Sequence, residues 1–178
     1  MVMTTLLCIS VDCSDNVFDQ LCTNETIYEN VMSGLVDSAL SGFNTAVCAY
    51  GQSGAGKTHT LTGSENEDGL VQNTFRALLE TISRANERKY MLRISYIEIY
   101  NERIRDLLND SASDLPIYEN KDGVAQIEGL KEVVVTEKAQ VEELLEKAQE
   151  RRQLAETCLN ERSSRSHTII RLTIESHD

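Results

Sequence analysis

Basic residues, paired cysteines and long apolar runs are all scarce in this sequence, and each shortage excludes a class of protein. The 178 residues hold 17 Lys and Arg against 29 Asp and Glu, a net charge of −12. This balance argues against nonspecific binding to nucleic acid or to an acidic membrane surface. No apolar stretch approaches the roughly 18 residues that a membrane-spanning helix needs. No basic residues precede the short apolar run near Met1, so a secretory signal is not expected.

The five cysteines are odd in number, widely scattered, and include no Cys-x-x-Cys pair. This distribution favours reduced thiols in a cytoplasmic protein. The alternative is a zinc site built from Cys8, Cys13 and Cys22. It lacks both the usual ligand spacing and a histidine partner.

The apolar periodicity predicts helices and strands in alternation along a single domain. Helices are expected to begin at Asn24, Val71 and Thr136, with a short helical patch at 103–108. Strands are expected at Thr45–Tyr50, Tyr90–Tyr100, near Ile127, at Val133–Val135 and at His167–Glu175. The alternation predicts an α/β layer sandwich around a mostly parallel or mixed central sheet.

One segment matches the phosphate-binding pattern G-x-x-x-x-G-K-[S/T] at every position. Its residues are Gly51, Gln52, Ser53, Gly54, Ala55, Gly56, Lys57 and Thr58. The glycines permit a loop whose backbone N–H groups turn inward around phosphate oxygens, while Lys57 reaches the β- and γ-phosphates and Thr58 binds Mg²⁺. An apolar run precedes the segment and residues able to open a helix follow it. A chance glycine-rich turn is therefore the weaker interpretation.

A second polar cluster lies at Asn160-Glu161-Arg162-Ser163-Ser164-Arg165-Ser166-His167, just before the last expected strand. Such hydroxyls and guanidinium groups can order around a γ-phosphate and Mg²⁺ and release when the phosphate leaves. Taken alone, the cluster reads more simply as a solvated serine-rich loop. His59 likewise reads, on spacing alone, as a partly exposed residue that opens a helix.

Together these segments resemble the kinesin motor domain. Ala49 to Leu61 resembles the family's P-loop, with Ser53 where threonine is commoner, and Asn160 to His167 resembles its switch I. Between them, Ser95 to Glu102 and Arg105 to Leu108 match a further kinesin signature. The ending from Ser166 to Ser176 looks most like the centromere-associated, kinesin-7-like subfamily.

The resemblance implies a P-loop NTPase-type three-layer sandwich that binds ATP and Mg²⁺ and acts on microtubules. It implies that His59 packs against the adenine and that Asn160 helps to order the nucleotide pocket. It further implies that Ser163 and Ser164 sense the γ-phosphate and the Mg²⁺ side, with Ser164 joining Thr58 at the metal. Arg165 falls on the arginine that pairs with a switch II glutamate.

Two family elements have no counterpart in these 178 residues. The Arg-x-Arg-Pro element that packs on the base does not appear before Val17, so adenine selectivity has weak support. The switch II motif Asp-Leu-Ala-Gly-Ser-Glu does not appear before Asp178. We therefore expect an irregular segment at 1–16 and a partial motor domain at 17–178, with its P-loop strand and last strand facing a gap.

Three functions stay open on this evidence. The first is a cytoplasmic, cytoskeleton-associated microtubule ATPase that, as this chain, hydrolyses poorly and binds tubulin weakly or not at all, with no nucleic-acid or membrane partner. The second is a non-motor fragment that binds nucleotide or a partner without turnover. The third is an unrelated P-loop kinase or GTPase, which would not carry the Asn-x-x-Ser-Ser-Arg-Ser-His cluster.

Overall fold

A computed structural model describes residues 15–84, 88–109, 114–157 and 166–177. Its helical elements are α1 (Asn24–Ile27), a π-helical turn η1 (Tyr28–Met32), α2 (Ser33–Leu40), α3 (Lys57–Thr62), α4 (Leu70–Arg84) and α5 (Lys138–Thr157). Its strands are β1 (Lys89–Tyr100), β2 (Arg103–Asp106), β3 (Ile117–Glu119), β4 (Ala125–Ile127), β5 (Val133–Val135) and β6 (Ser166–His177). In this part of the chain, no helix is long and apolar enough to cross a membrane.

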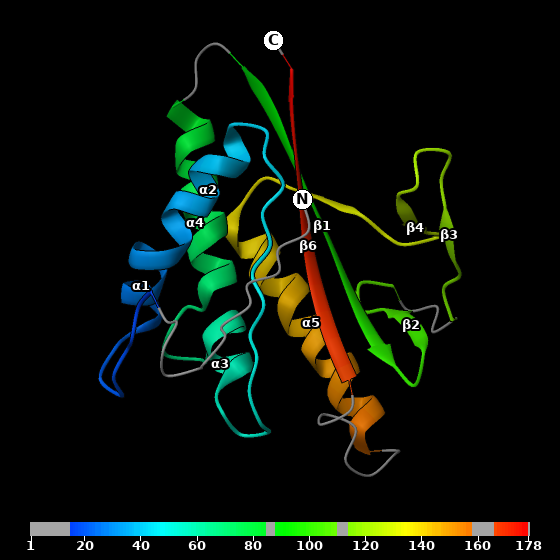
Figure 1. Cartoon of the computed structure of the whole chain (residues 1–178), viewed down its shortest axis with the longest axis horizontal. Helices are drawn as coiled ribbons and strands as arrows, with labels where there is room; N and C mark the ends of the chain where they lie inside the picture. Colours follow the sequence, from blue (N-terminus) through cyan, green and yellow to red (C-terminus); the bar gives the residue numbers. More distant parts are fainter. Residues whose placement is uncertain (1–14, 85–87, 110–113, 158–165, 178) are drawn as a thin grey trace.

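The long strand β1 organises the main sheet. It pairs along its whole length with β6, from Lys89 opposite His177 to Tyr100 opposite Ser166. Its other edge carries β5 beside Leu92–Ile94 and β2 beside Ile97–Tyr100. Every strand pair in the described residues is antiparallel, and β3 and β4 form a separate two-stranded sheet (Figure 1).

The hydrophobic core lies between one face of this sheet and two helices. Most of its buried side chains come from α4, β1 and α5, with others from α2, β5, β6 and the segment after β2; they include Phe75, Leu78, Leu92, Ile94, Val141, Ala148 and Leu172. On β1 the side chains that point to this core alternate with those of the other face, as the strand period of two requires. The helices α4 and α5 therefore cover the same side of the sheet.

Most expected elements are confirmed, with small changes at their ends. The helix expected from Asn24 forms as α1, η1 and α2, and its N-cap is Thr23, whose Oγ1 accepts a hydrogen bond from the Thr26 N–H. Gly42 ends this helical stretch with a φ of +95°, the left-handed conformation that glycine tolerates best. The helices expected at Val71 and Thr136 form as α4 and α5.

The helical patch expected at 103–108 is wrong. This segment forms strand β2, because Asn101 and Glu102 both adopt positive φ angles, 49° and 59°, and reverse the chain after β1. Two central residues with positive φ make the tight turn whose twist suits a β-hairpin. Tyr100 and Arg103 then face each other as the first pair.

The strand expected at Thr45–Tyr50 is also wrong. Residues 43–50 run past β6 as an extended trace and form no ladder with any described strand (Figure 1). An apolar run adopts a strand only when a neighbour offers hydrogen bonds. The buried Thr45 Oγ1 has no hydrogen-bond partner in the described part of the chain. The mixed sheet expected here would have needed this segment as its parallel strand.

Candidate functional site

The residues of the phosphate-binding pattern form the turn that enters α3. Gly54 and Gly56 have φ angles of +81° and +85°, which residues with a side chain rarely adopt. A Cβ atom at either position would meet nothing within 4 Å, so the conformation of the backbone, not crowding, requires glycine there. The loop therefore keeps its backbone uncovered on the side where a ligand can approach.

Lys57 folds back over the same loop. Its Nζ donates hydrogen bonds to the carbonyl oxygens of Gly51 and Gln52, both at 2.7 Å. These bonds hold the ammonium group against the turn and keep its charge at the loop. An anion bound in the loop would therefore lie close to the positive charge of the Lys57 ammonium group.

A cavity of about 700 Å³ opens beside this loop. One wall is made of loop and α3 residues, namely Ser53, Gly54, Gly56, Lys57, Thr58 and His59. The cavity is also lined by the first half of β6, by Tyr96 of β1 and Arg152 of α5, by residues 47–49 and by the first half of α4. This volume lies within the range of small-molecule sites, which is roughly 300–1,000 Å³.

The structure thus brings together the P-loop residues expected to bind a nucleotide, from Ser53 to His59. Gly51, Gln52 and Ala55 belong to the same turn, although they do not line the cavity. Asn160, Ser163, Ser164 and Arg165 lie outside the described residues. Their segment joins α5 to β6, and residues at both of these elements, Arg152 and Ser166, line the cavity.

A buried ion pair between Glu98 and Arg152 lies beside the cavity, and the sequence did not lead us to predict it. Glu98 of β1 is only 1% exposed, and its Oε1 lies 3.7 Å from Nε of Arg152. Arg152 Nη2 also contacts the Ser166 hydroxyl at 3.4 Å. The signal was present in the sequence, since Glu98 has the same strand parity as the core residues Leu92, Ile94 and Tyr96. A charged side chain on the core-facing side of a strand is costly to bury unless a group of opposite charge pairs with it, so a partner could have been predicted.

Tyr96 lies beside this pair and gives a testable pH dependence. Burial raises the pKa of Tyr96 above the usual tyrosine value, against the smaller opposing effects of Arg152 and a hydrogen bond with Thr168. The folded state thus favours the neutral phenol. This contribution to the free energy of unfolding is complete below the unfolded-state pKa and is lost as the pH rises through the folded-state pKa.

We therefore expect the stability of the chain to fall above about pH 10, and to fall less steeply in Tyr96→Phe. Urea unfolding at a series of alkaline pH values measures this difference. Tyr118→Phe is the matched control, because Tyr118 is 52% exposed on β3 and should leave the slope unchanged. Parallel profiles for wild type and Tyr96→Phe would contradict the expectation.

Comparison with known proteins places this site in a family. A model of the kinesin motor domain matches residues 13–178. The chain is 43% identical over 162 residues to the kinesin-like protein KIN-7L of Oryza sativa subsp. japonica, covering 91% of this chain and 25% of that protein. It is 39% identical over 164 residues to human kinesin-like protein KIF19, covering 90% of this chain and 16% of that protein. The chain thus spans a quarter or less of the length of these curated relatives.

The fold agrees with this comparison. A solved structure described as a fast kinesin superposes with a TM-score of 0.85 at 36% identity, over 91% of this chain and 47% of that one. The expected α/β fold of a P-loop motor domain is thereby confirmed, as is the family resemblance drawn from the three sequence motifs. From its loop, its cavity and these relatives, the chain belongs to the kinesin motor-domain family.

Proposed function

We propose that this chain binds ATP with Mg²⁺ in the cavity between the P-loop and β6. The observation that carries the proposal is the wall made of Ser53, Gly54, Gly56, Lys57, Thr58 and His59, with a conformation at Gly54 and Gly56 that leaves the backbone open. The donor set fits the ligand, since it offers an ammonium group, a hydroxyl and main-chain groups to a polyanion.

Each residue has a distinct role in this proposal. Lys57 moves from the Gly51 and Gln52 carbonyls to the β- and γ-phosphates, and the Thr58 hydroxyl joins the shell of Mg²⁺. The metal, when bound, neutralises charge that develops on the phosphate oxygens. The His59 side chain, 51% exposed at the cavity wall, packs its ring on the base.

The residues between α5 and β6 complete the proposal. In this proposal Ser163 and Ser164 contact the γ-phosphate and the side of the site that holds Mg²⁺, and Asn160 orders the pocket. Arg165 forms an ion pair with a carboxylate when the site closes. Support comes from the two ends of this segment, because Arg152 and Ser166 both line the cavity. Phosphoryl transfer depends almost entirely on such positioning.

A fluorescent-ATP titration in the presence of Mg²⁺ tests the binding proposal. We expect saturable binding that unlabelled ATP displaces and that weakens when EDTA removes the metal. An absence of saturable binding in the micromolar to millimolar range would contradict it. GTP competition measures how far the site selects its base.

We further propose that this chain descends from microtubule motors, proteins that hydrolyse ATP on microtubules at the cytoskeleton. The solved relative is described in terms of an ATPase mechanism and interactions with microtubules. The alternative is binding of nucleotide or of a partner without turnover. It is favoured by the 43–50 segment, which forms no ladder with any described strand, so the part of the cavity lined by residues 47–49 is not supported by the sheet.

For the 178-residue chain tested alone, we expect little co-pelleting with microtubules and little stimulation of phosphate release. The net charge of −12 opposes association with the acidic surface of tubulin. Sedimentation at low ionic strength, where screening is weakest, measures this most sensitively. Clear co-pelleting with raised turnover would contradict the expectation and favour an active motor.

A further inference from the structure

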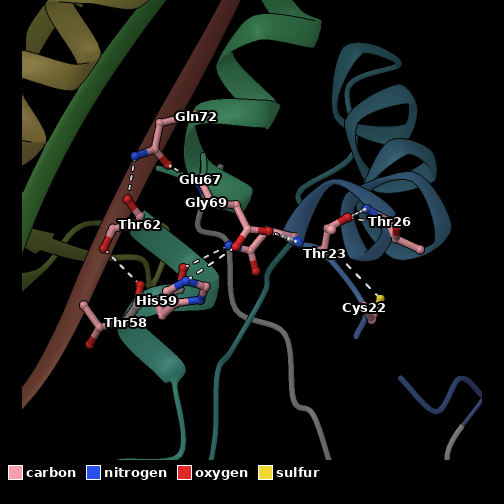
Figure 2. A network of polar contacts seen from close by, with 10 residues as sticks. Cys22, Thr23, Thr26, Thr58, His59, Thr62, Glu67, Gly69 and Gln72 are labelled. Carbon is pink, nitrogen blue, oxygen red and sulfur yellow. Dashed lines mark hydrogen bonds and ion pairs between the residues drawn. The ribbon is translucent and has the colours of Figure 1, made fainter. Parts of the chain in front are cut away.

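The ring of His59 lies beside a carboxylate from the loop that follows α3. Figure 2 shows Glu67 beside the imidazole, with Nε2 of His59 lying 3.5 Å from Oε2 of Glu67. The other oxygen of Glu67, Oε1, accepts a hydrogen bond of 2.6 Å from the backbone N–H of Asn24, at the start of α1. The Glu67 carboxylate therefore contacts both His59 at the cavity wall and the start of α1, which lies 43 residues before Glu67 in the chain.

Asn24 contacts the backbone of the same histidine. Its side-chain Nδ2 donates a 3.2 Å hydrogen bond to the carbonyl oxygen of His59, and the residue is only 3% exposed. His59 thus has two contacts, a carboxylate of Glu67 beside its ring and a hydrogen bond from Asn24 to its carbonyl. The buried Asn24 side chain binds the third residue of the six-residue helix α3 and so helps to fix where that helix lies.

The loop that carries Glu67 is itself rigidly placed. Ser64 and Glu67 exchange backbone hydrogen bonds across its turn, at 2.8 Å and 3.4 Å. The next residue, Asp68, forms ion pairs with Arg76 of α4 and with Lys138 of α5. A carboxylate on such a loop limits the rotamers of a ring that would otherwise turn freely in solvent.

We propose that Glu67 is a positioning residue that orients the His59 ring for stacking on the base of a nucleoside triphosphate. This inference rests on the proposed nucleotide site, which places phosphates at Lys57. His59 lies two residues further along α3, at the same cavity wall. A planar ring held at that wall offers a face to the planar part of the ligand.

The test separates the base from the phosphates. In Glu67→Gln the single amide oxygen still accepts from the Asn24 N–H, while an amide NH₂ replaces the oxygen that faces His59. We expect the affinity for ATP to fall about 3- to 10-fold and the affinity for inorganic tripolyphosphate to stay within about 2-fold, because only the stacked base is disturbed. Glu65→Gln, an exposed glutamate of the same loop, is the matched control for lost charge.

A double-mutant cycle keeps the inference falsifiable if Glu67→Gln perturbs folding. We expect His59→Ala to lower ATP affinity by a similar factor, and Glu67→Gln to add nothing in the His59→Ala background. Unchanged ATP affinity in His59→Ala, additive effects in the double variant, or an equal loss for tripolyphosphate would each overturn the inference. Wild-type chain that binds neither ATP nor tripolyphosphate would overturn the proposed site itself and this inference with it.

Discussion

Replacing Lys57 with alanine is expected to lower the affinity for ATP by about 10- to 150-fold. A hydrogen bond to a charged group contributes about 1.5–3 kcal/mol, and in the proposed nucleotide site Lys57 is the charge that would contact the β- and γ-phosphates. The structure also indicates that Lys57→Ala should leave no buried polar group without a hydrogen-bond partner. Among the described residues, the Nζ of Lys57 donates hydrogen bonds to the loop carbonyls of Gly51 and Gln52. Both residues are exposed, so these carbonyls stay accessible to water in Lys57→Ala.

Fluorescent-ATP titration of both proteins measures this loss, with thermal melting to show that each is folded. Lys147→Ala is the matched control, because Lys147 is an exposed lysine of α5 that forms an ion pair with Glu143 one turn earlier and does not line the cavity. It should bind ATP as the wild type does. Equal affinities for wild type and Lys57→Ala would remove the basis of the P-loop assignment.

Gly69→Ala is expected to destabilise the chain by about 3 kcal/mol and to weaken nucleotide binding as well, since added volume in a packed site forces the backbone to shift. An ideal Cβ at Gly69 would lie 2.5 Å from the Leu61 carbonyl oxygen and closer still to the Gly63 nitrogen. Both are backbone atoms at the end of α3, so neither can rotate away. The helix that begins with Lys57 and Thr58 would have to move.

Gly34→Ala is the matched control for this prediction. Gly34 lies exposed in α2, and an added Cβ would meet nothing within 4 Å. Alanine there should stabilise the chain by about 0.5–1 kcal/mol, because glycine loses more backbone entropy in a helix. Urea unfolding of both variants measures the contrast. A Gly69→Ala chain as stable as the wild type would show that the backbone at Gly69 does not lie against Leu61 and Gly63 as the structure places it.

Strong local patterns predicted most of the fold. Helix α4 follows from a long apolar periodicity, strand β1 from a run rich in β-branched and aromatic residues, and β6 covers the strand expected at His167–Glu175. Two failures have a common cause. The strand expected at Thr45–Tyr50 needs a hydrogen-bonding neighbour, and the helix expected at 103–108 was overruled by a turn at Asn101–Glu102. Both depend on what lies next to the segment, which periodicity does not encode.

The candidate site also has one part that the sequence predicted and one part that it did not. The loop from Gly51 to Thr58 is contiguous, so its pattern was readable, and the structure places it at a cavity. The network of Asn24, Glu67 and His59 joins residues up to 43 positions apart and matches no local motif. Only the folded arrangement of α1, α3 and the loop before α4 brings these three groups together.

Hydrogen exchange with and without ATP and Mg²⁺ tests most directly whether the nucleotide lies between the P-loop and β6. We predict slower exchange in peptides that cover 51–59 and 166–172, two segments that line the cavity. Peptides from the β3–β4 hairpin, whose residues do not line the cavity, should exchange at the same rate in both conditions. Unchanged exchange at 51–59 under saturating nucleotide would contradict the account.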